Sequence, residues 1–226
     1  MAEAARLVAG LTGPEWVMAR HQTRGRGRRG RAWATARGNF AATLALPVAG
    51  GPAEAALRSF VAALALSDAL GALIGGAGAL TLKWPNDVLL NGGKVAGILL
   101  EILPGGWLLV GIGVNLCHAP APEELEPTAV RPVSLAGECG VEIGPEALLD
   151  TLAPAFARWE ARLQTEGFAP VRAEWLARAA RLGERITARA GTRTLTGIFE
   201  TVDAQGHLVL SDAAGRHVLP AAEVHF

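Results

Sequence analysis

The sequence predicts an α+β protein in which a mixed, largely antiparallel sheet is flanked by helices and followed by a small β-barrel. Apolar, strand-like runs fill residues 80–116, and the Asn-Gly-Gly and Pro-Gly-Gly turns between them are typical of antiparallel hairpins. Long helical patterns lie on both sides of this region. After Leu182-Gly183, short β-prone segments recur about every ten residues, which favours a barrel. We therefore expect one domain over residues 1–181 and a second over residues 182–226.

The elements that precede the hairpins are predicted from apolar periodicity and from helix and strand breakers. Residues 2–10 predict a helix that ends at its glycine. EWVMAR at 15–20 predicts a short strand, and NFAATLALP at 39–47 predicts a second strand that its proline closes. A long helix is expected over residues 53–74, because apolar residues recur there on one face.

The rest of the chain divides in the same way. The strands of the antiparallel meander are expected at residues 80–84, 87–90, 94–103 and 107–116. An exposed connection rich in proline and glutamate, residues 117–132, leads to helices at 145–166 and 168–180. The strands of the barrel are expected at residues 184–190, 192–202, 207–212 and 216–224.

Composition narrows the class of protein and its compartment. The chain has 226 residues, half of them apolar, and a formal net charge of zero, which argues against a general attraction to nucleic acid. Cys117 and Cys139 are the only cysteines and form no CxxC pair, so we expect neither a disulfide framework nor a structural metal. Residues 59–80 are the most membrane-like run, but Asp68 and frequent glycines favour a buried helix. Because no signal-peptide pattern opens the chain, we expect a soluble cytoplasmic protein.

The run RGRGRRGR at residues 24–31 contains the pattern G-x-G-x-x-G at Gly25, Gly27 and Gly30. A dinucleotide-binding site needs a helix after the third glycine and an acidic residue about twenty positions later. Here a strand follows instead, and no acid occurs until Glu54. The context therefore argues against a Rossmann-type cofactor site.

Three other interpretations of this run remain. An RNA-binding arginine–glycine segment is usually repeated and lies in polar surroundings, whereas this one occurs once between apolar strands. A solvated turn does not explain so many arginines alternating with glycine. We favour a glycine-hinged loop that closes over a polyanion such as a triphosphate and excludes water. The arginines that would surround the anion are Arg26, Arg28, Arg29 and Arg31.

A second polar stretch, KWPND, begins at Lys83 and ends with Asn86 and Asp87, and Lys94 follows across a hairpin turn. Lys83 and Lys94 are the only lysines in a chain that otherwise uses arginine. Pro85 predicts a tight bend that turns the next two side chains off the sheet. Taken alone, these residues are also compatible with an ordinary Asx turn and a solvated strand lysine.

A third stretch has the pattern Gly111-x-Gly113-x-Asn115. It puts two positions without side chains on one face of a strand, where a ligand can lie flat against the backbone. Tight packing between strands would produce the same pattern, so the glycines do not decide between the two interpretations.

Together these stretches resemble the biotin protein ligases. The resemblance rests on RHQTRGRGRRGRAW at 20–33, LKWPNDVLLNGGKVAGILLE at 82–101 and VGIGVNL at 110–116, in this order and spacing. It implies a catalytic domain like those of class II aminoacyl-tRNA synthetases, and a C-terminal barrel of the Src-homology-3 type. It also implies an ATP-dependent ligase that joins biotin to a lysine of a biotin carboxyl carrier protein through biotinyl-5′-AMP. Mg²⁺ is inferred from the use of ATP, and the metal ligands are left open.

The resemblance also implies roles for individual residues. Residues expected at the biotin site are Gln22, Gly25, Arg26, Arg28, Lys94, Gly97, Gly111 and Gly113. Residues expected at the ATP or adenylate site are Arg28, Arg29, Arg31, Trp33, Asn86 and Asn115, with Trp33 near the adenine. The residues expected to be catalytic are Lys94, Arg26, Arg28 and Asp87. The five histidines, at positions 21, 118, 207, 217 and 225, are expected to be structural or exposed.

The sequence departs from the family pattern in two respects, and each departure leads to an expectation. The family commonly has a Ser-Thr stretch before its first catalytic helix, whereas this sequence starts with Met1-Ala2-Glu3-Ala4, so we suspect a start codon placed too late. There is also no N-terminal helix-turn-helix pattern, which argues against a repressor role and against DNA as a partner. A homodimer through an exposed sheet edge stays open. Lipoate–protein ligase and an RNA-binding module remain the alternative functions.

Overall fold

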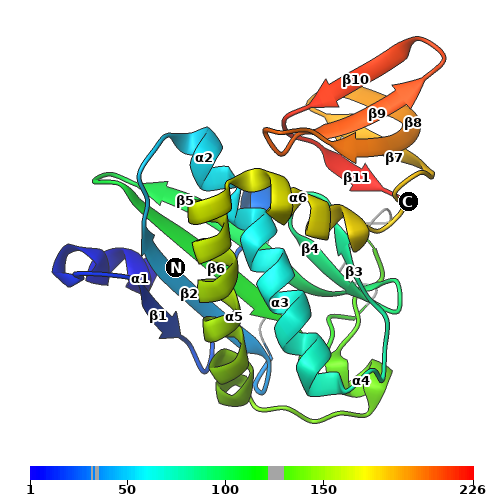
Figure 1. The fold of residues 1–226 in the computed structure, drawn as a ribbon. Helices are drawn as coiled ribbons and strands as arrows, with labels where there is room; N and C mark the ends of the chain where they lie inside the picture. The colour runs from blue at the N-terminus through cyan, green and yellow to red at the C-terminus, as the bar shows by residue number, and fades with distance from the viewer. Residues whose placement is uncertain (32, 34–35, 122–129) are drawn as a thin grey trace.

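The computed structural model describes residues 1–31, 33, 36–121 and 130–226, and at Arg29 it describes the backbone but not the side chain. Half of the predicted 117–132 connection, residues 122–129, lies outside the described part. The chain forms two sheets, and helices cover one face of the larger sheet (Figure 1). The expectation of an α+β protein is therefore confirmed.

The larger sheet has six strands in the order β1-β2-β6-β5-β4-β3. Its strands are β1 (Glu15–Met18), β2 (Phe40–Pro47), β3 (Leu80–Lys83), β4 (Asp87–Leu90), β5 (Gly93–Leu103) and β6 (Trp107–Val114). Neighbouring strands in this order are antiparallel, and the parallel component consists of the isolated bridges Leu82–Ala179 and Lys94–Pro132. The predicted meander is thus present, and residues at its hairpin turns have left-handed backbones, with φ of +49° at Asn91 and +78° at Gly92.

The helices that frame this sheet are α1 (Ala2–Leu7), α2 (Pro52–Ala56), α3 (Arg58–Ile74), α4 (Leu135–Cys139), α5 (Pro145–Glu166) and α6 (Phe168–Ala177). Helices α3 and α5 lie side by side across one face (Figure 1). Helix α3 ends at Gly75, whose φ of +57° is readily adopted by glycine and lets its N–H bond to the carbonyl of Gly71.

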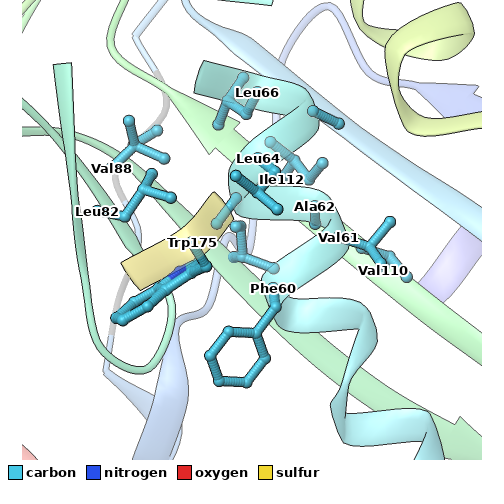
Figure 2. Packing of buried hydrophobic residues seen from close by; sticks show 14 of the residues in the cluster. Phe60, Val61, Ala62, Leu64, Leu66, Leu82, Val88, Val110, Ile112 and Trp175 are labelled. Atoms are coloured by element: carbon cyan, nitrogen blue, oxygen red, sulfur yellow. The ribbon is translucent and has the colours of Figure 1, made fainter. Parts of the chain in front are cut away.

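The core forms where α3 meets the sheet (Figure 2). Val61 and Leu64 of α3 lie near Val110 and Ile112 of β6, and all four are buried. Trp175 of α6 closes the end of this layer, with its ring centroid 5.2 Å from that of Phe60 in an edge-on arrangement. The space between α3 and this face of the sheet is therefore filled with apolar side chains.

The helical segment Pro52–Ile74 is long and apolar enough to cross a membrane on length and composition alone. Within the protein, 72% of its most apolar stretch is buried. Because that burial is against the sheet and α5, the segment is the central helix of the core, as the sequence predicts.

Two helical features differ from the sequence-based expectation. The helix predicted over residues 53–74 is divided at Leu57, where the carbonyl of Glu54 accepts from the N–H of Leu57 and from the Arg58 guanidinium. These bonds replace the regular α-helical partner of that carbonyl. Helix α4 was not predicted, although the hydroxyl of Ser134 accepts from the N–H of Gly137 and marks its start.

The second sheet has five antiparallel strands in the order β10-β9-β8-β7-β11. Its strands are β7 (Arg185–Ala190), β8 (Arg193–Val202), β9 (Leu208–Asp212), β10 (Gly215–Leu219) and β11 (Glu223–His225). The single strand predicted over 216–224 was wrong. Pro220 has no N–H for a ladder and ends β10, and β11 then crosses to pair with β7.

An ion pair between two core helices carries a stability prediction. Arg58 of α3 and Glu160 of α5 lie 2.8 Å apart, with 5% and 9% of their side chains exposed. Glu160→Ala leaves a buried guanidinium without this partner, so we expect it to lower the free energy of unfolding by about 3–5 kcal/mol. Urea denaturation measures this change. Glu166→Ala, in the exposed pair with Arg162, is the control and should change stability by about 0.5 kcal/mol or less; equal effects of the two would contradict the prediction.

Candidate active site

A cavity of about 890 Å³ lies against the six-stranded sheet, within the size range of small-molecule sites. Side chains alternate along β6, so Val110 and Ile112 point toward α3 while Gly111 and Gly113 face the cavity. The floor of the cavity is thus the face of the sheet that the core helices leave uncovered.

Every predicted site residue whose side chain is described lines this cavity. These residues are Gln22, Gly25, Arg26, Arg28, Arg31, Trp33, Asn86, Asp87, Lys94, Gly97, Gly111, Gly113 and Asn115. The backbone of Arg29 belongs to the 3₁₀ turn Arg28–Gly30, and its side chain lies outside the described part. The three sequence stretches therefore meet in one place.

The basic run folds back on itself above the cavity. The N–H of Gly27 donates to the carbonyl of Arg31 at 2.8 Å, and the N–H of Trp33 donates to the carbonyl of Gly25 at 3.0 Å. A Cβ at position 25 would collide with the carbonyl oxygen of Trp33. Gly25 is therefore required for the loop to close on itself, a packing reason that the glycine pattern alone did not show.

The arginines of the loop contact three different strands or turns. Arg26 donates to Glu101 of β5 at 2.8 Å, and Arg28 makes a long contact of 3.4 Å with the amide oxygen of Asn86 between β3 and β4. Arg31 forms an ion pair with Glu223 of β11. The loop is thus fixed at both ends and in the middle by acceptors of the protein.

Where β4 and β5 form the wall of the cavity, the carboxylate of Asp87 lies between two lysine ammonium groups. Asp87 begins β4, and one of its oxygens lies 2.7 Å from the Nζ of Lys94, while the other lies 3.9 Å from the Nζ of Lys83. Burial lowers the pKa of Lys83 below its usual value, and the charge of Asp87 partly offsets this effect. Both lysines line the cavity, but the side chain of Lys94 is more exposed than that of Lys83, so Lys94 is the more accessible of the two to a ligand's charge.

Trp33 lies on the glycine floor. A Cβ at Gly113 would come within 2.5 Å of the indole Nε1, and one at Gly97 within 3.1 Å of its six-membered ring. The Nζ of Lys94 is 5.6 Å from the ring centroid, a cation–π distance. The sequence-based expectation put Trp33 on the nucleotide side and Gly97 and Gly113 at biotin, whereas this structure places the indole directly on both glycines.

The two asparagines are held by the backbone. Asn86 donates its amide to the carbonyl of Ile98 at 2.7 Å, and Asn115, which is buried, donates to the carbonyl of Val133 at 3.1 Å. Both amides therefore have fixed orientations at the cavity wall. Their second role, as predicted phosphate contacts, stays a prediction.

Several cavity residues were missed at the sequence level. The side chain of Met1 covers Gly111, where a Cβ would come within 2.7 Å of its sulfur. Glu223 and His225 of β11 also line the cavity, so the expectation that His225 is only structural or exposed was incomplete. The other four histidines are absent from the described lining. No local pattern in the last five residues signals a site, because their proximity depends on how the second sheet packs.

The sequence matches two family models. Residues 3–115 match the biotin/lipoate A/B protein ligase family, and residues 182–226 match the biotin protein ligase C-terminal domain. The first match contains all of the predicted site residues, and the second contains the β11 residues that line the cavity.

Named relatives agree with these matches. A Paracoccus denitrificans protein named biotin–[acetyl-CoA-carboxylase] ligase is 60% identical over 229 residues, covering 100% of this chain and 95% of that protein. A Mycobacterium tuberculosis protein of the same name is 35% identical over 210 residues, covering 91% and 76%. The structure of a biotin protein ligase from Aquifex aeolicus in complex with biotin and ATP matches with a TM-score of 0.82 at 25% identity, covering 98% and 92%. The chain belongs to the biotin/lipoate A/B protein ligase family.

Proposed function

We propose that this protein ligates biotin to a lysine of a biotin carboxyl carrier protein, using ATP and passing through biotinyl-5′-AMP. The observation that carries the proposal is the meeting of three features in one cavity: the arginine–glycine loop, the Lys94–Asp87 pair and the glycine floor. The names of the relatives favour biotin over lipoate as the acid.

In the first step, a carboxylate oxygen of biotin attacks the α-phosphorus of ATP, and pyrophosphate leaves. Two anions approach each other, so the barrier is largely electrostatic, and fixed cations lower it. Lys94, whose Nζ lies on the cavity side of β5, is assigned to the developing charge at the α-phosphate. Arg26 and Arg28 are assigned to the biotin carboxylate end, and Arg31 to the phosphates.

In the second step, the neutral amine of the acceptor lysine attacks the carbonyl carbon of the mixed anhydride, AMP leaves, and the amine's extra proton passes to solvent. Asp87 lies 2.7 Å from the ammonium of Lys94 and holds it at the cavity wall. Because Asp87 already lies between two ammonium groups, we assign it to orienting these cations rather than to removing a proton.

Mg²⁺ is proposed to enter with the nucleotide. Among the residues that the structure describes, no three His, Cys, Asp or Glu side chains come together as a metal site. Mg²⁺ is often held by one or two carboxylates and the substrate's phosphates, so a site without a dedicated ligand cluster fits MgATP as the substrate.

We further propose a division of the chain at residues 181–182, supported by the family match at 182–226 and by the start of β7 at Arg185. The proposed compartment is the cytoplasm, where carboxylase carrier domains and ATP are available. A homodimer stays a prediction, and β1 is the edge strand proposed for it, because residues 178–180 already pair with the outer edge of β3 at Leu82.

The test of the function is biotin-dependent exchange of labelled pyrophosphate into ATP by the purified protein. We expect exchange with biotin, little exchange with lipoate, and transfer of biotin to a carrier domain, detected as a gain in mass. Equal exchange with lipoate would contradict the proposed substrate. Absence of exchange with either acid, together with salt-dependent RNA binding, would support the RNA-binding alternative instead.

A further inference from the structure

Glu223 lies where the second sheet meets the arginine–glycine loop. Its carboxylate uses one oxygen for each of two arginines: Oε1 pairs with Arg31 of the loop, and Oε2 accepts from Arg189 of β7 at 2.9 Å. Only 16% of the side chain is exposed. The carboxylate therefore bridges the second sheet and the loop in a partly shielded position, where ion pairs are stronger than on an open surface.

The backbone fixes this carboxylate from the side of the second sheet. β11 pairs with β7 in a register that puts Glu223 opposite Arg189, and opposite charges across a strand pair stabilise that register. Glu223 is thus held by the sheet, whereas Arg31 belongs to the loop, where its carbonyl accepts from the N–H of Gly27 of the same loop. The ion pair consequently positions the loop relative to the sheet, and not the reverse.

The charge of Glu223 also reaches the floor of the cavity. It raises the pKa of Lys83, against the larger lowering that burial causes. The negative charge is therefore felt among the cationic groups that face the cavity, although Glu223 belongs to the second sheet.

We propose that Glu223 is a positioning residue: by holding Arg31 it fixes the arginine–glycine loop over the phosphate side of the cavity, so that the C-terminal sheet sets the loop's affinity for ATP. This inference rests on the proposed function, because it takes ATP as the ligand beneath the loop. Glu223 acts through Arg31, and no contact of its own with the nucleotide is assigned.

The first test is kinetic. Glu223→Gln keeps the shape of the side chain and removes its charge, so the loop loses its ion pair with the second sheet while its contacts with Glu101 and Asn86 remain. At saturating biotin, we expect the KM for ATP in pyrophosphate exchange to rise about fivefold, with kcat and the KM for biotin within about twofold of the wild type. Glu200→Gln is the matched control, since Glu200 pairs with Arg216 in the same sheet and away from the cavity; its KM for ATP should not change.

A double-mutant cycle tests whether the effect passes through Arg31. If it does, Glu223→Gln adds little to the rise in KM for ATP already caused by Arg31→Ala. Independent, multiplying effects of the two substitutions would overturn the assignment. A general loss of kcat in Glu223→Gln, with a KM for ATP unchanged, would also overturn it.

The second test does not depend on activity. The loop contains several arginines, so trypsin cleavage within residues 24–31 reports how well the loop is held. Without substrates, Glu223→Gln should be cleaved there several times faster than the wild type, and Glu200→Gln at the wild-type rate. If Glu223→Gln does not fold, Arg31→Gln breaks the same pair from the loop side and should show the same faster cleavage.

Unchanged cleavage of both Glu223→Gln and Arg31→Gln would refute the positioning role. If the wild type showed no biotin-dependent exchange but the variants were still cleaved faster, the proposed substrate would be refuted. The role of Glu223 in positioning the loop would still be supported. The failures of the two proposals are therefore distinguishable.

Discussion

Lys94→Ala should lower the rate of biotinyl-adenylate formation by roughly 100- to 1,000-fold, the range observed when one fixed donor is removed from a developing oxyanion. The ammonium group lies on the cavity side of β5, 2.7 Å from Asp87, and joining two anions requires a cation at that place. Biotin binding should weaken far less, because the glycine floor and the loop remain. Single-turnover release of pyrophosphate measures the first quantity, and calorimetric titration with biotin the second.

Two further substitutions separate charge from packing. The stem of Lys94 lies near Gly97, so alanine also removes contacts. Lys94→Met keeps most of the stem and should be as slow as alanine, whereas Lys94→Arg keeps the charge in a different shape and should recover part of the rate. A pyrophosphate-release rate in Lys94→Ala equal to that of the wild type would exclude the role assigned to this lysine.

Gly113→Val should weaken biotin binding by roughly 10- to 100-fold, the effect of adding methyl groups to a filled space. The atoms nearest to an added Cβ belong to the indole of Trp33, within 2.9 Å, so the valine side chain enters the cavity and not the core. Thermal stability should therefore change little while the affinity for biotin falls. Titration calorimetry and thermal unfolding, carried out on the same preparation, measure the two quantities.

Gly10→Val is the matched control for this experiment. A Cβ at Gly10 meets nothing within 4 Å, and the residue ends the 3₁₀ turn after α1, away from the cavity lining. Its affinity for biotin should equal that of the wild type. If Gly113→Val bound biotin normally, the floor formed by β5 and β6 would not be the biotin surface.

Features determined by short stretches of sequence were predictable. The Asn91-Gly92 turn needs positive φ at adjacent residues, and its sequence is one of the few that adopts it without strain. Such turns fix the order of the strands in the meander, and strand order in turn brings Lys94 close to Asp87. The fold of the six-stranded sheet and the residues that line the cavity therefore follow from local rules together with the family resemblance.

Features that depend on distant parts of the chain were not predictable. Glu223 reaches Arg31 only because Pro220 ends β10 and lets β11 cross to β7. A three-residue strand carries too little periodicity to be recognised. The position of Trp33 was missed for a related reason: the loop closes on itself through backbone hydrogen bonds, which its side-chain pattern does not encode.

The indole of Trp33 on Gly97 and Gly113 changes what biotin binding involves. If biotin binds on these glycines as proposed, it takes over a surface that the indole covers in this structure. The hydrophobic gain is then only the difference between two apolar contacts, so the affinity depends on where the displaced ring goes. A ring that moves to cover the nucleotide recovers the lost contact only when ATP is present, and the two substrates would then strengthen each other's binding.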